Sequence, residues 1–363
     1  MNRDPPSESD LKEVGYDPSV EHAGNFLVED RAIIEAIPHT ESLEVLPLAL
    51  AMERYPWLRE RYFHLVDKDQ DEYTREAAAI GPTGFFIRVF AGQKVLLPVQ
   101  SCFLLRTPGL RQVVHNLVIA EEGAELHLVN GCTTASYTDV GVHIGVTEYY
   151  VGANARVTST MIHHWGAAVE VYPRTAAHVE QGGHFVSNYI AMSKVGRIQM
   201  YPTATLESNA TATFNSVVYA PSGSSLDLGA RAILRGAHAA ADIISRAVSD
   251  GGYVMNRGHI IGESAGSRGH MECNGLLLKE KGVIHAIPEL EGRAPEIALS
   301  HEAPVGMISQ EELSYLMASG LAEESARSLI IQGFLEMPLA DLPPFLQKTI
   351  RALVVRARSG EAV

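Results

Sequence analysis

The segments TATFNSVVY (211–219) and SLDLGARAIL (225–234) decide the fold of this chain. Small, apolar or β-branched residues alternate in them with polar ones, which is typical of half-buried strands. The segments AELHLV (124–129) and ARVTSTMI (155–162) show the same pattern earlier in the chain. Proline is sparse inside these segments, as a hydrogen-bonded ladder requires. The sequence therefore predicts a mainly β region over residues 86–300.

Turn-forming residues separate the β segments at nearly regular intervals of roughly 14 residues or about twice that, which fits a repeated strand-and-turn unit. They are Gly123, Gly152, Gly182, Asn209, Gly223, Gly236, Gly252 and Gly266. Both a β-solenoid of stacked turns and an antiparallel sandwich satisfy this spacing, because spacing alone does not choose between parallel and antiparallel pairing. The many small and β-branched residues, with few aromatic ones, favour the solenoid.

Residues 1–85 show helical spacing of apolar residues. The segments VEDRAIIEAIP (28–38) and LEVLPLALAMERYPWLRERYFHLV (43–66) carry charged residues between apolar ones, as surface helices do. We therefore expect an N-terminal helical region over residues 1–85.

Residues 301–363 are also expected to be helical. Ser309 and Glu312 predict a capping box at a helix start, and Gly320 is a suitable residue just past the helix end. A last amphipathic segment, FLQKTIRALVVRAR, spans 345–358. The predicted order is a helical region, a β core and a second helical region.

Charge and cysteine content limit the functional class. The chain has 363 residues and a net charge of −14, which disfavours nucleic acid or an anionic membrane as the main partner. No apolar run reaches the roughly 18–20 residues of a transmembrane helix, and MNRDPPSESD at the N-terminus does not resemble a signal peptide. The three cysteines, Cys102, Cys132 and Cys273, are too scattered for a disulfide framework. We expect a cytoplasmic protein with reduced thiols.

Cys273 is the first candidate site residue, because it follows Glu272 and lies close to His270. Alternate side chains of a strand point to opposite faces, so Cys273 should face away from both neighbours and share a face with Met271. A buried core cysteine is the common alternative to a ligand or a sulfur carrier.

Cys132 is the second candidate. It follows a glycine in NGCTT (130–134), where we expect an accessible turn. His163 and Trp165, in IHHWG (162–166), should lie near the same rim. The alternative is a pair of satisfied histidines beside a core tryptophan.

His301 and Glu302, in SHEAPVG (300–306), form the third candidate. The following proline and glycine predict a turn, and loops on rigid scaffolds often carry function. The sequence has no phosphate-binding loop, dinucleotide fingerprint, CxxC or HExxH motif, so nucleotide binding or an ordinary zinc site is unsupported. A carbohydrate-active β-helix enzyme would need a cluster of carboxylates along one face, and none stands out.

Soft thiolates bind iron–sulfur units, and stable clusters usually take four of them. Three scattered cysteines could hold a cluster only loosely, with imidazole or carboxylate ligands and a second subunit. A loose hold suits a cluster donor better than an electron carrier.

Several segments resemble the SufB/SufD family of iron–sulfur cluster assembly scaffolds. They are RGHMECNGLLL (268–278), AIPELEG (286–292), LSHEAPVGMISQEELSYLMASGLAEESARSLIIQGFLE (299–336) and, more loosely, KVLLPVQ (94–100), AEEGAELHLVNGCTT (120–134) and IHHWG. The resemblance implies a right-handed parallel β-helix flanked by N- and C-terminal helical regions. It also implies a soluble ABC-type ATPase partner, SufC, docked on the C-terminal helical region.

The resemblance also implies roles for single residues. Cys132 matches the cysteine of the family's G-C-T motif, a proposed sulfur entry point. Cys273 matches the proposed sulfur acceptor or cluster ligand. His163, His164 and Trp165 match a Q-N-W motif in which only the tryptophan is kept, and His163 and Trp165 are candidate residues of a sulfur path.

Ser300, His301 and Glu302 match an E-H-E motif of SufB-type members, with the first glutamate replaced. SufD-type members usually carry S-H-G there and lack the acceptor cysteine. The chain therefore combines features of both types. We expect Cys273, His301 and Glu302 to be the cluster or iron ligands, duplicated in a homodimer.

The expected function is a non-enzymatic scaffold that accepts sulfur and iron and builds a transient iron–sulfur cluster for transfer, while the SufC-type partner hydrolyses ATP. Further expected partners are a sulfur donor, apo iron–sulfur proteins and, in place of a second copy, a SufB/SufD paralogue. The alternative is a SufD-like helper that organises the ATPase and iron entry without holding sulfur. The sequence leaves the cluster type and a flavin requirement open.

Overall fold

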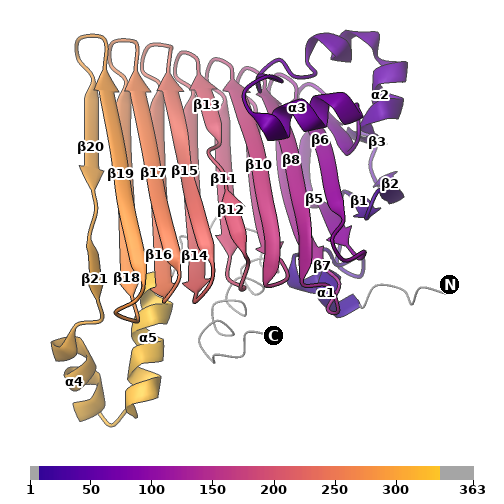
Figure 1. The fold of residues 1–363 in the computed structure, drawn as a ribbon. Helices are drawn as coiled ribbons and strands as arrows, with labels where there is room; N and C mark the ends of the chain where they lie inside the picture. Colours follow the sequence, from indigo (N-terminus) through magenta and orange to yellow (C-terminus); the bar gives the residue numbers. More distant parts are fainter. Residues whose placement is uncertain (1–7, 336–363) are drawn as a thin grey trace.

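The structure, a computed structural model, describes residues 8–335 and consists mainly of two long sheets that face each other (Figure 1). Together they form a parallel β-solenoid of about 8 turns. The predicted mainly β fold with parallel stacking is therefore confirmed. The segment 345–358, which we expect to be helical, lies outside the described residues.

The first sheet, sheet A, has the order β2-β1-β5-β7-β9-β11-β14-β16-β18-β20, with β21 beside β18. Its strands are β1 (Gly24–Glu29), β2 (Ala32–Pro38), β5 (Lys94–Leu105), β7 (Glu125–Thr134), β9 (Arg156–His164), β11 (His184–Ala191), β14 (Thr211–Pro221), β16 (Ala240–Asp250), β18 (Arg268–Leu277), β20 (Ala298–Glu302) and β21 (Val305–Met307).

The second sheet, sheet B, has the order β19-β17-β15-β12-β10-β8-β6-β4-β3, with β13 between β10 and β15. Its strands are β3 (Leu43–Pro47), β4 (Phe85–Val89), β6 (Arg111–Ala120), β8 (Val140–Val151), β10 (Ala168–Val179), β12 (Arg197–Gln199), β13 (Thr203–Leu206), β15 (Ser225–Leu234), β17 (Tyr253–Gly262) and β19 (Val283–Gly292).

Successive turns of the solenoid stack in register, so equivalent residues form rows that cross the strands. One inner row of sheet A contains Leu126, Val157, Phe185, Ala212 and Ala241. All of them are buried in the core between the sheets. Polar residues alternate with them along each strand, as the period-two pattern predicts.

The predicted turn residues lie between the strands. Gly123, Gly182 and Asn209 have positive φ angles of 65°, 68° and 58°, a conformation that favours glycine and asparagine. Gly236 meets a different demand, because a Cβ atom there would lie 1.9 Å from the backbone nitrogen of Ser208. The turns thus need glycine both for left-handed backbone and for close stacking.

The expected helix over residues 28–38 is wrong. This segment forms the end of β1 and all of β2, which pair in an antiparallel hairpin, and Asp30 takes a positive φ of 52° between them. Residues 43–47 form β3 rather than a helix start. β1 pairs in parallel with β5 and so extends the solenoid. The β-branched residues Ile33, Ile34 and Ile37 lie on β2, which pairs with β1, and such residues favour strands.

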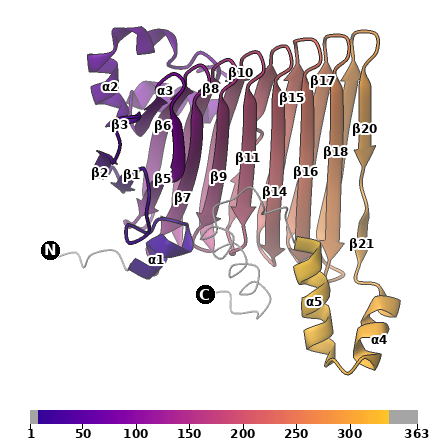
Figure 2. The same cartoon turned by 180° about the vertical axis from the view of Figure 1, so that it is seen from behind.

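The helices of the N-terminal region are α1 (Glu8–Glu13), α2 (Leu48–Arg54), the 3₁₀ helix η1 (Pro56–Glu60) and α3 (Glu72–Ile80). The helix α1 packs on the outer face of sheet A (Figure 2), where Val14 joins a cluster with Cys102. The helix α3 covers the outer face of sheet B, where Ala77 packs near Ile144.

The helices α4 (Gln310–Ala318) and α5 (Glu323–Leu335) form the C-terminal part of the described chain. Ser309 accepts a hydrogen bond from the Glu312 amide at 3.4 Å, which confirms Ser309 as the N-cap and gives the serine half of the predicted capping box. Gly320 has a φ of 97° just past the helix end, as predicted. Leu335 packs on the outer face of sheet A. Within residues 8–335, no helix combines the length and apolar character needed to cross a bilayer.

Candidate functional site

Cys132 lies in the middle of the solenoid wall, with its side chain in the core and 1% exposed. It is part of strand β7, so the expected accessible turn is wrong. The neighbouring Gly131 points outward, where a Cβ atom would lie 2.6 Å from Val14 of the chain after α1. The Cys132 Sγ atom lies 3.7 Å from the Met161 Sδ atom on the next strand of sheet A.

Aromatic and imidazole groups surround Cys132 in the core. His163 is the register partner of Cys132 on β9, and its Nδ1 atom hydrogen-bonds the Tyr189 hydroxyl at 2.9 Å. The Trp165 ring lies 5.6 Å from the His163 ring and 5.0 Å from the His143 ring, measured between centroids. The structure thus brings His163 and Trp165 to Cys132.

Burial decides the protonation states of these groups. It lowers the pKa of His163 well below its ordinary value and that of His143 to about 3. It raises the pKa of the Cys132 thiol well above its ordinary value. Near pH 7, both imidazoles are neutral and the thiol is protonated. His164 points away from this cluster, and its Nδ1 atom lies 3.5 Å from Glu13.

A row of inner side chains connects this cluster with Cys273. Met161, Tyr189, Ser216, Ser245 and Cys273 are successive register partners on β9, β11, β14, β16 and β18. A small cavity of about 20 Å³ opens at this row and is lined by Tyr189, Ser216 and Ser245. A cavity of that size holds about one water molecule.

Cys273 is buried on the inner face of β18 beside Met271, as strand alternation predicts. His270 and Glu272 lie on the outer face, where their side chains are 3.2 Å apart, and His270 also contacts the Ser300 hydroxyl at 2.8 Å. Burial raises the pKa of the Cys273 thiol to about 11. Since the thiolate is the nucleophile and metal ligand, Cys273 needs a change of environment before it reacts.

His301 and Glu302 end strand β20 instead of lying on the expected turn. His301 is the register partner of Met271, and Glu302 is the partner of Glu272. His301 therefore shares the inner face with Cys273, whereas Glu302 points to the outer face. Within one chain, the structure brings two of the three expected ligands to the same face, and Glu302 is not among them.

The Cys273–His301 site lies at an open end of the solenoid. β19 and β20 are the last strands of their sheets in the described chain, and they form one edge of the molecule in Figure 1. Apolar side chains are exposed there, including Ile287 at 36% and Leu290 at 38%. The buried His301 Nε2 atom has no hydrogen-bond partner among the described residues.

The two inner cysteines are far apart. Five strand spacings separate β7 from β18 along sheet A, which amounts to roughly 24 Å at the usual distance between strands. Cys102 does not belong to either site, because it lies on the outer face of sheet A beneath α1. The residues that sequence reasoning missed are Met161, Tyr189 and His143, and only the register between turns identifies them.

The fold and these sites define a class: a parallel β-solenoid with isolated thiols in its core, flanked by short helical segments. Residues 103–334 match the family model described as "SUF system FeS cluster assembly, SufBD core domain". The chain therefore belongs to the SufBD family of iron–sulfur cluster assembly proteins.

Related proteins can be aligned with almost the whole chain. An iron–sulfur cluster assembly SufBD family protein of Archaeoglobus fulgidus is 46% identical over 349 residues, which cover 96% of this chain and 94% of the relative. A protein of the same description from Methanothermobacter thermautotrophicus is 40% identical over 357 residues, with 96% and 87% coverage. Another from Pyrococcus horikoshii is 33% identical over 322 residues, with 88% and 72% coverage.

Proposed function

We propose that this protein is a scaffold on which sulfur and iron are assembled into a transient iron–sulfur cluster. The observation that carries this proposal is the placement of Cys273 and His301 on one inner face, on neighbouring strands, at the open end of the solenoid. A thiolate and an imidazole are both ligands for iron–sulfur units. Two such ligands per chain hold a cluster weakly, as a donor requires.

Sulfur enters at Cys132 in this proposal. The Cys132 thiolate attacks the outer sulfur of a donor persulfide, the donor leaves as a thiolate, and Cys132 becomes the persulfide. The polar inner row from Tyr189 to Ser245 leads from the Cys132 cluster toward Cys273 and supports Cys273 as the end of the sulfur path. The departing donor thiolate takes up the proton of the Cys132 thiol, because burial lowers the pKa of His163 well below its ordinary value and makes it a weak base.

A second copy completes the cluster site. The exposed apolar residues and unpaired edges of β19 and β20 are features that folded proteins usually cover. Two chains joined by a two-fold axis at this end would contribute two copies of Cys273 and His301, four ligands in all. A SufB/SufD paralogue could take the place of the second copy.

The helical hairpin α4–α5 is the proposed docking site for a SufC-type ABC ATPase, which supplies ATP hydrolysis. Its exposed apolar side chains support this role: Tyr315 is 73% exposed, Leu329 48% and Met317 42%. The hairpin follows directly on β20 and β21, so a movement of the helices would act on the strand that carries His301. Such a movement could expose the Cys273 thiol.

The central test is anaerobic reconstitution with iron and sulfide, followed by measurement of bound iron, acid-labile sulfide and visible absorbance. Cys273→Ala and His301→Gln should lose most of the bound cluster. Cys102→Ala is the matched control, because it also removes a buried thiol from sheet A but on the outer face. If Cys273→Ala binds as much iron and sulfide as the wild type, the proposed site is wrong.

Two surface variants separate the partners. Leu290→Asp, on β19, should weaken self-association and leave co-purification with the ATPase intact. Leu329→Asp, on α5, should do the reverse. Both residues are exposed, so the substitutions should not disturb the core, and each variant controls for the other in light scattering and pull-down measurements. Equal effects of both variants on both measurements would contradict the assignment.

A SufD-like helper is the second candidate function, and the outward position of Glu302 favours it. One chain then contributes no complete ligand set, and its task would be to organise the ATPase and iron entry. In that case the wild-type homodimer would bind the ATPase but retain no acid-labile sulfide after reconstitution. The same measurement therefore distinguishes the two functions.

A further inference from the structure

A second cavity lies on the outer face of sheet B, away from the buried cysteines. Its volume is about 350 Å³. Tyr150, His178 and Thr205 form its floor, and they are register partners on the adjacent strands β8, β10 and β13. The side walls come from elsewhere: Arg61 and His64 from the segment after η1, and Arg235 from the end of β15.

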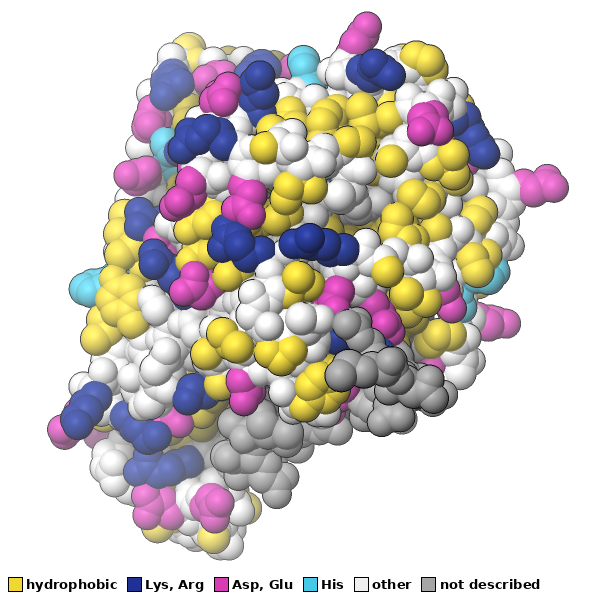
Figure 3. Space-filling view, turned by 45° about the vertical axis from the view of Figure 1, so that its right-hand side comes forward, with side chains coloured by type: hydrophobic (Ala, Val, Ile, Leu, Met, Phe, Trp, Pro, Cys, Tyr) yellow, Lys and Arg dark blue, Asp and Glu magenta, His cyan; other side chains and the backbone are white. Residues whose placement is uncertain are grey.

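The lining of this cavity is basic. It contains two arginines and two histidines and no acidic residue: Arg61, His64, Leu65, Tyr150, His178, Thr205 and Arg235. The whole chain has a net charge of −14, and acidic and basic side chains are mixed over the surface in Figure 3. Among residues 8–335, the ion pairs of Arg235 are long contacts of 3.9 Å to Glu207 and Glu263, neither of which lines the cavity.

Contacts within the protein fix the position of the cavity wall that carries Arg61 and His64. The Arg61 guanidinium lies 4.7 Å from the centre of the Tyr150 ring, and the Tyr150 hydroxyl donates to the Arg61 carbonyl at 2.7 Å. The fully buried Glu148 carboxylate accepts hydrogen bonds from the amides of Phe63 and Val66, at 2.8 and 3.2 Å. The segment that carries Arg61 and His64 is therefore fixed to sheet B.

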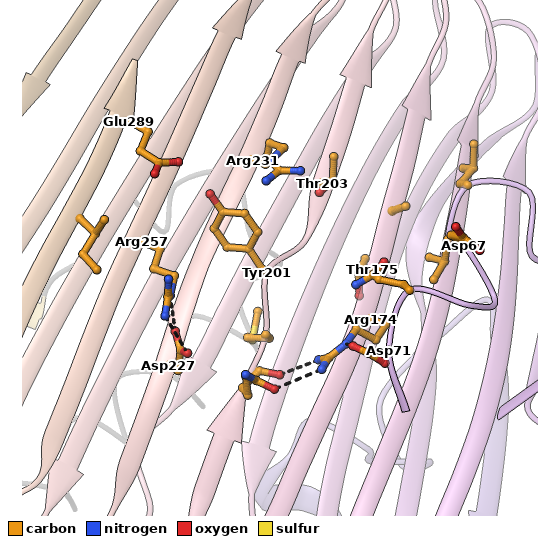
Figure 4. A pocket seen from close by; sticks show the side chains of 17 residues that line it. Asp67, Asp71, Arg174, Thr175, Tyr201, Thr203, Asp227, Arg231, Arg257 and Glu289 are labelled. Carbon is orange, nitrogen blue, oxygen red and sulfur yellow. Dashed lines mark hydrogen bonds and ion pairs between the residues drawn. The ribbon is translucent and has the colours of Figure 1, made fainter. Parts of the chain in front are cut away.

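A larger neighbouring groove shows the contrast (Figure 4). It has a volume of about 750 Å³ and also contains arginines, but two of them are neutralised. Arg174 pairs with Asp71, and Arg257 pairs with Asp227, each at 2.6 Å. Leu65 lines both spaces. The third arginine of the groove, Arg231, has no ion pair among the described residues. What distinguishes the smaller cavity is its lining, which lacks the carboxylates that line the groove, among them Asp71 and Asp227.

We propose that the cavity formed by Arg61, His64, His178, Thr205 and Arg235 binds a small anion with two or more oxyanion groups. Guanidinium groups present paired N–H donors that match phosphate and carboxylate oxygens. The imidazole N–H groups and a threonine hydroxyl add further donors. Phosphate-bearing compounds and polycarboxylates share this chemistry. The site is independent of the cysteine-based function, because none of its residues contacts the inner row.

The test is isothermal titration of the full chain with pyrophosphate and, separately, with citrate; acetate is the singly charged reference. We expect pyrophosphate or citrate to bind at least about tenfold more tightly than acetate, a difference of about 1.4 kcal/mol. Stronger binding of pyrophosphate would identify phosphate compounds as the source of the ligand, and stronger binding of citrate would identify polycarboxylates.

Variants locate the binding site. Arg235→Gln and His178→Gln should each weaken the binding of the preferred anion, the arginine variant by about tenfold. Arg257→Gln, in the neighbouring groove, is the matched control and should change affinity less than about twofold. Circular dichroism checks that each variant is folded, and Arg61→Gln replaces Arg235→Gln if that variant does not fold. Equal affinity for all three anions, or equal loss in the Arg257 control, would overturn the proposal.

Discussion

Cys132 lies directly opposite His163 in the parallel pairing of β7 and β9, and both side chains point into the core. Because burial keeps the thiol protonated and the imidazole neutral, this pair does not form a ready thiolate–imidazolium couple. The chemistry of this site therefore depends on access rather than on a pre-ionised nucleophile.

The reactivity of Cys273 should depend steeply on pH. Its thiol has a pKa of about 11 in the folded protein, against 9.0 for an ordinary cysteine. Alkylation of Cys273 by iodoacetamide should therefore be slow near neutral pH and should rise with pH well beyond 9. Peptide mass spectrometry of the labelled protein measures this site by site. Fast labelling of Cys273 at neutral pH in the isolated chain would contradict the buried placement.

The raised pKa of Cys273 also predicts how the stability of the folded protein depends on pH. The folded protein holds the thiol proton more tightly than the unfolded chain, so stability is complete below about pH 9 and falls as pH rises toward about 11. The loss from Cys273 should be roughly 2 kcal/mol. Urea unfolding at both ends of this range, in the presence of a reductant, should show a smaller loss for Cys273→Ala than for the wild type.

Glu148 should be a major contributor to the stability of the segment over residues 61–66. Besides the backbone amides of Phe63, Leu65 and Val66, it bonds the Nε2 atom of the fully buried His115 at 2.8 Å. Glu148→Ala leaves these groups unpaired, and removal of one partner of such a buried pair costs about 3–5 kcal/mol. We expect that loss in urea unfolding, together with faster tryptic cleavage after Arg61.

The control for this prediction is Glu125→Ala. Glu125 is partly exposed and lies 3.6 Å from His127, so its loss should cost less than about 1 kcal/mol. Equal stability of the Glu148 and Glu125 variants would show that the buried carboxylate does not hold the segment.

Gly236 should not tolerate a side chain. The backbone nitrogen of Ser208, on the preceding turn of the solenoid, lies where a Cβ atom would be, so Gly236→Ala requires the two turns to separate. We expect a destabilisation of more than about 2 kcal/mol. Gly292→Ala is the control, since its Cβ atom would find only ordinary contacts at 3.9 Å or more. Similar melting temperatures for both variants would contradict this account.

The sequence predicts the strands and turns of the solenoid well, because a turn residue that tolerates a positive φ recurs between strands, as at Gly123, Gly182 and Asn209. It does not predict the pairing, since parallel and antiparallel ladders need the same alternation. The error at residues 28–38 has a local cause. The apolar side chains of Ile33, Ile34 and Ile37 have the spacing of a helix face, and the hairpin turn at Asp30 lacks glycine.

The candidate site, too, can be predicted from the sequence only in part. Strand alternation places Cys273 and His270 on opposite faces, as the structure confirms. The same rule separates His301 from Glu302, but the proline that follows suggested a turn and obscured it. Which residues meet across strands depends on register, and register depends on the number of residues in each turn. That count is set by the three-dimensional stacking and is not visible in any one motif.

The stacking of turns also has an evolutionary consequence. Each added or deleted turn would change the distance between Cys132 and Cys273 by one strand spacing, about 4.8 Å, and would leave the immediate surroundings of both thiols intact. In the proposed sulfur path, the number of turns between the two cysteines would thus set the length of the route in uniform steps.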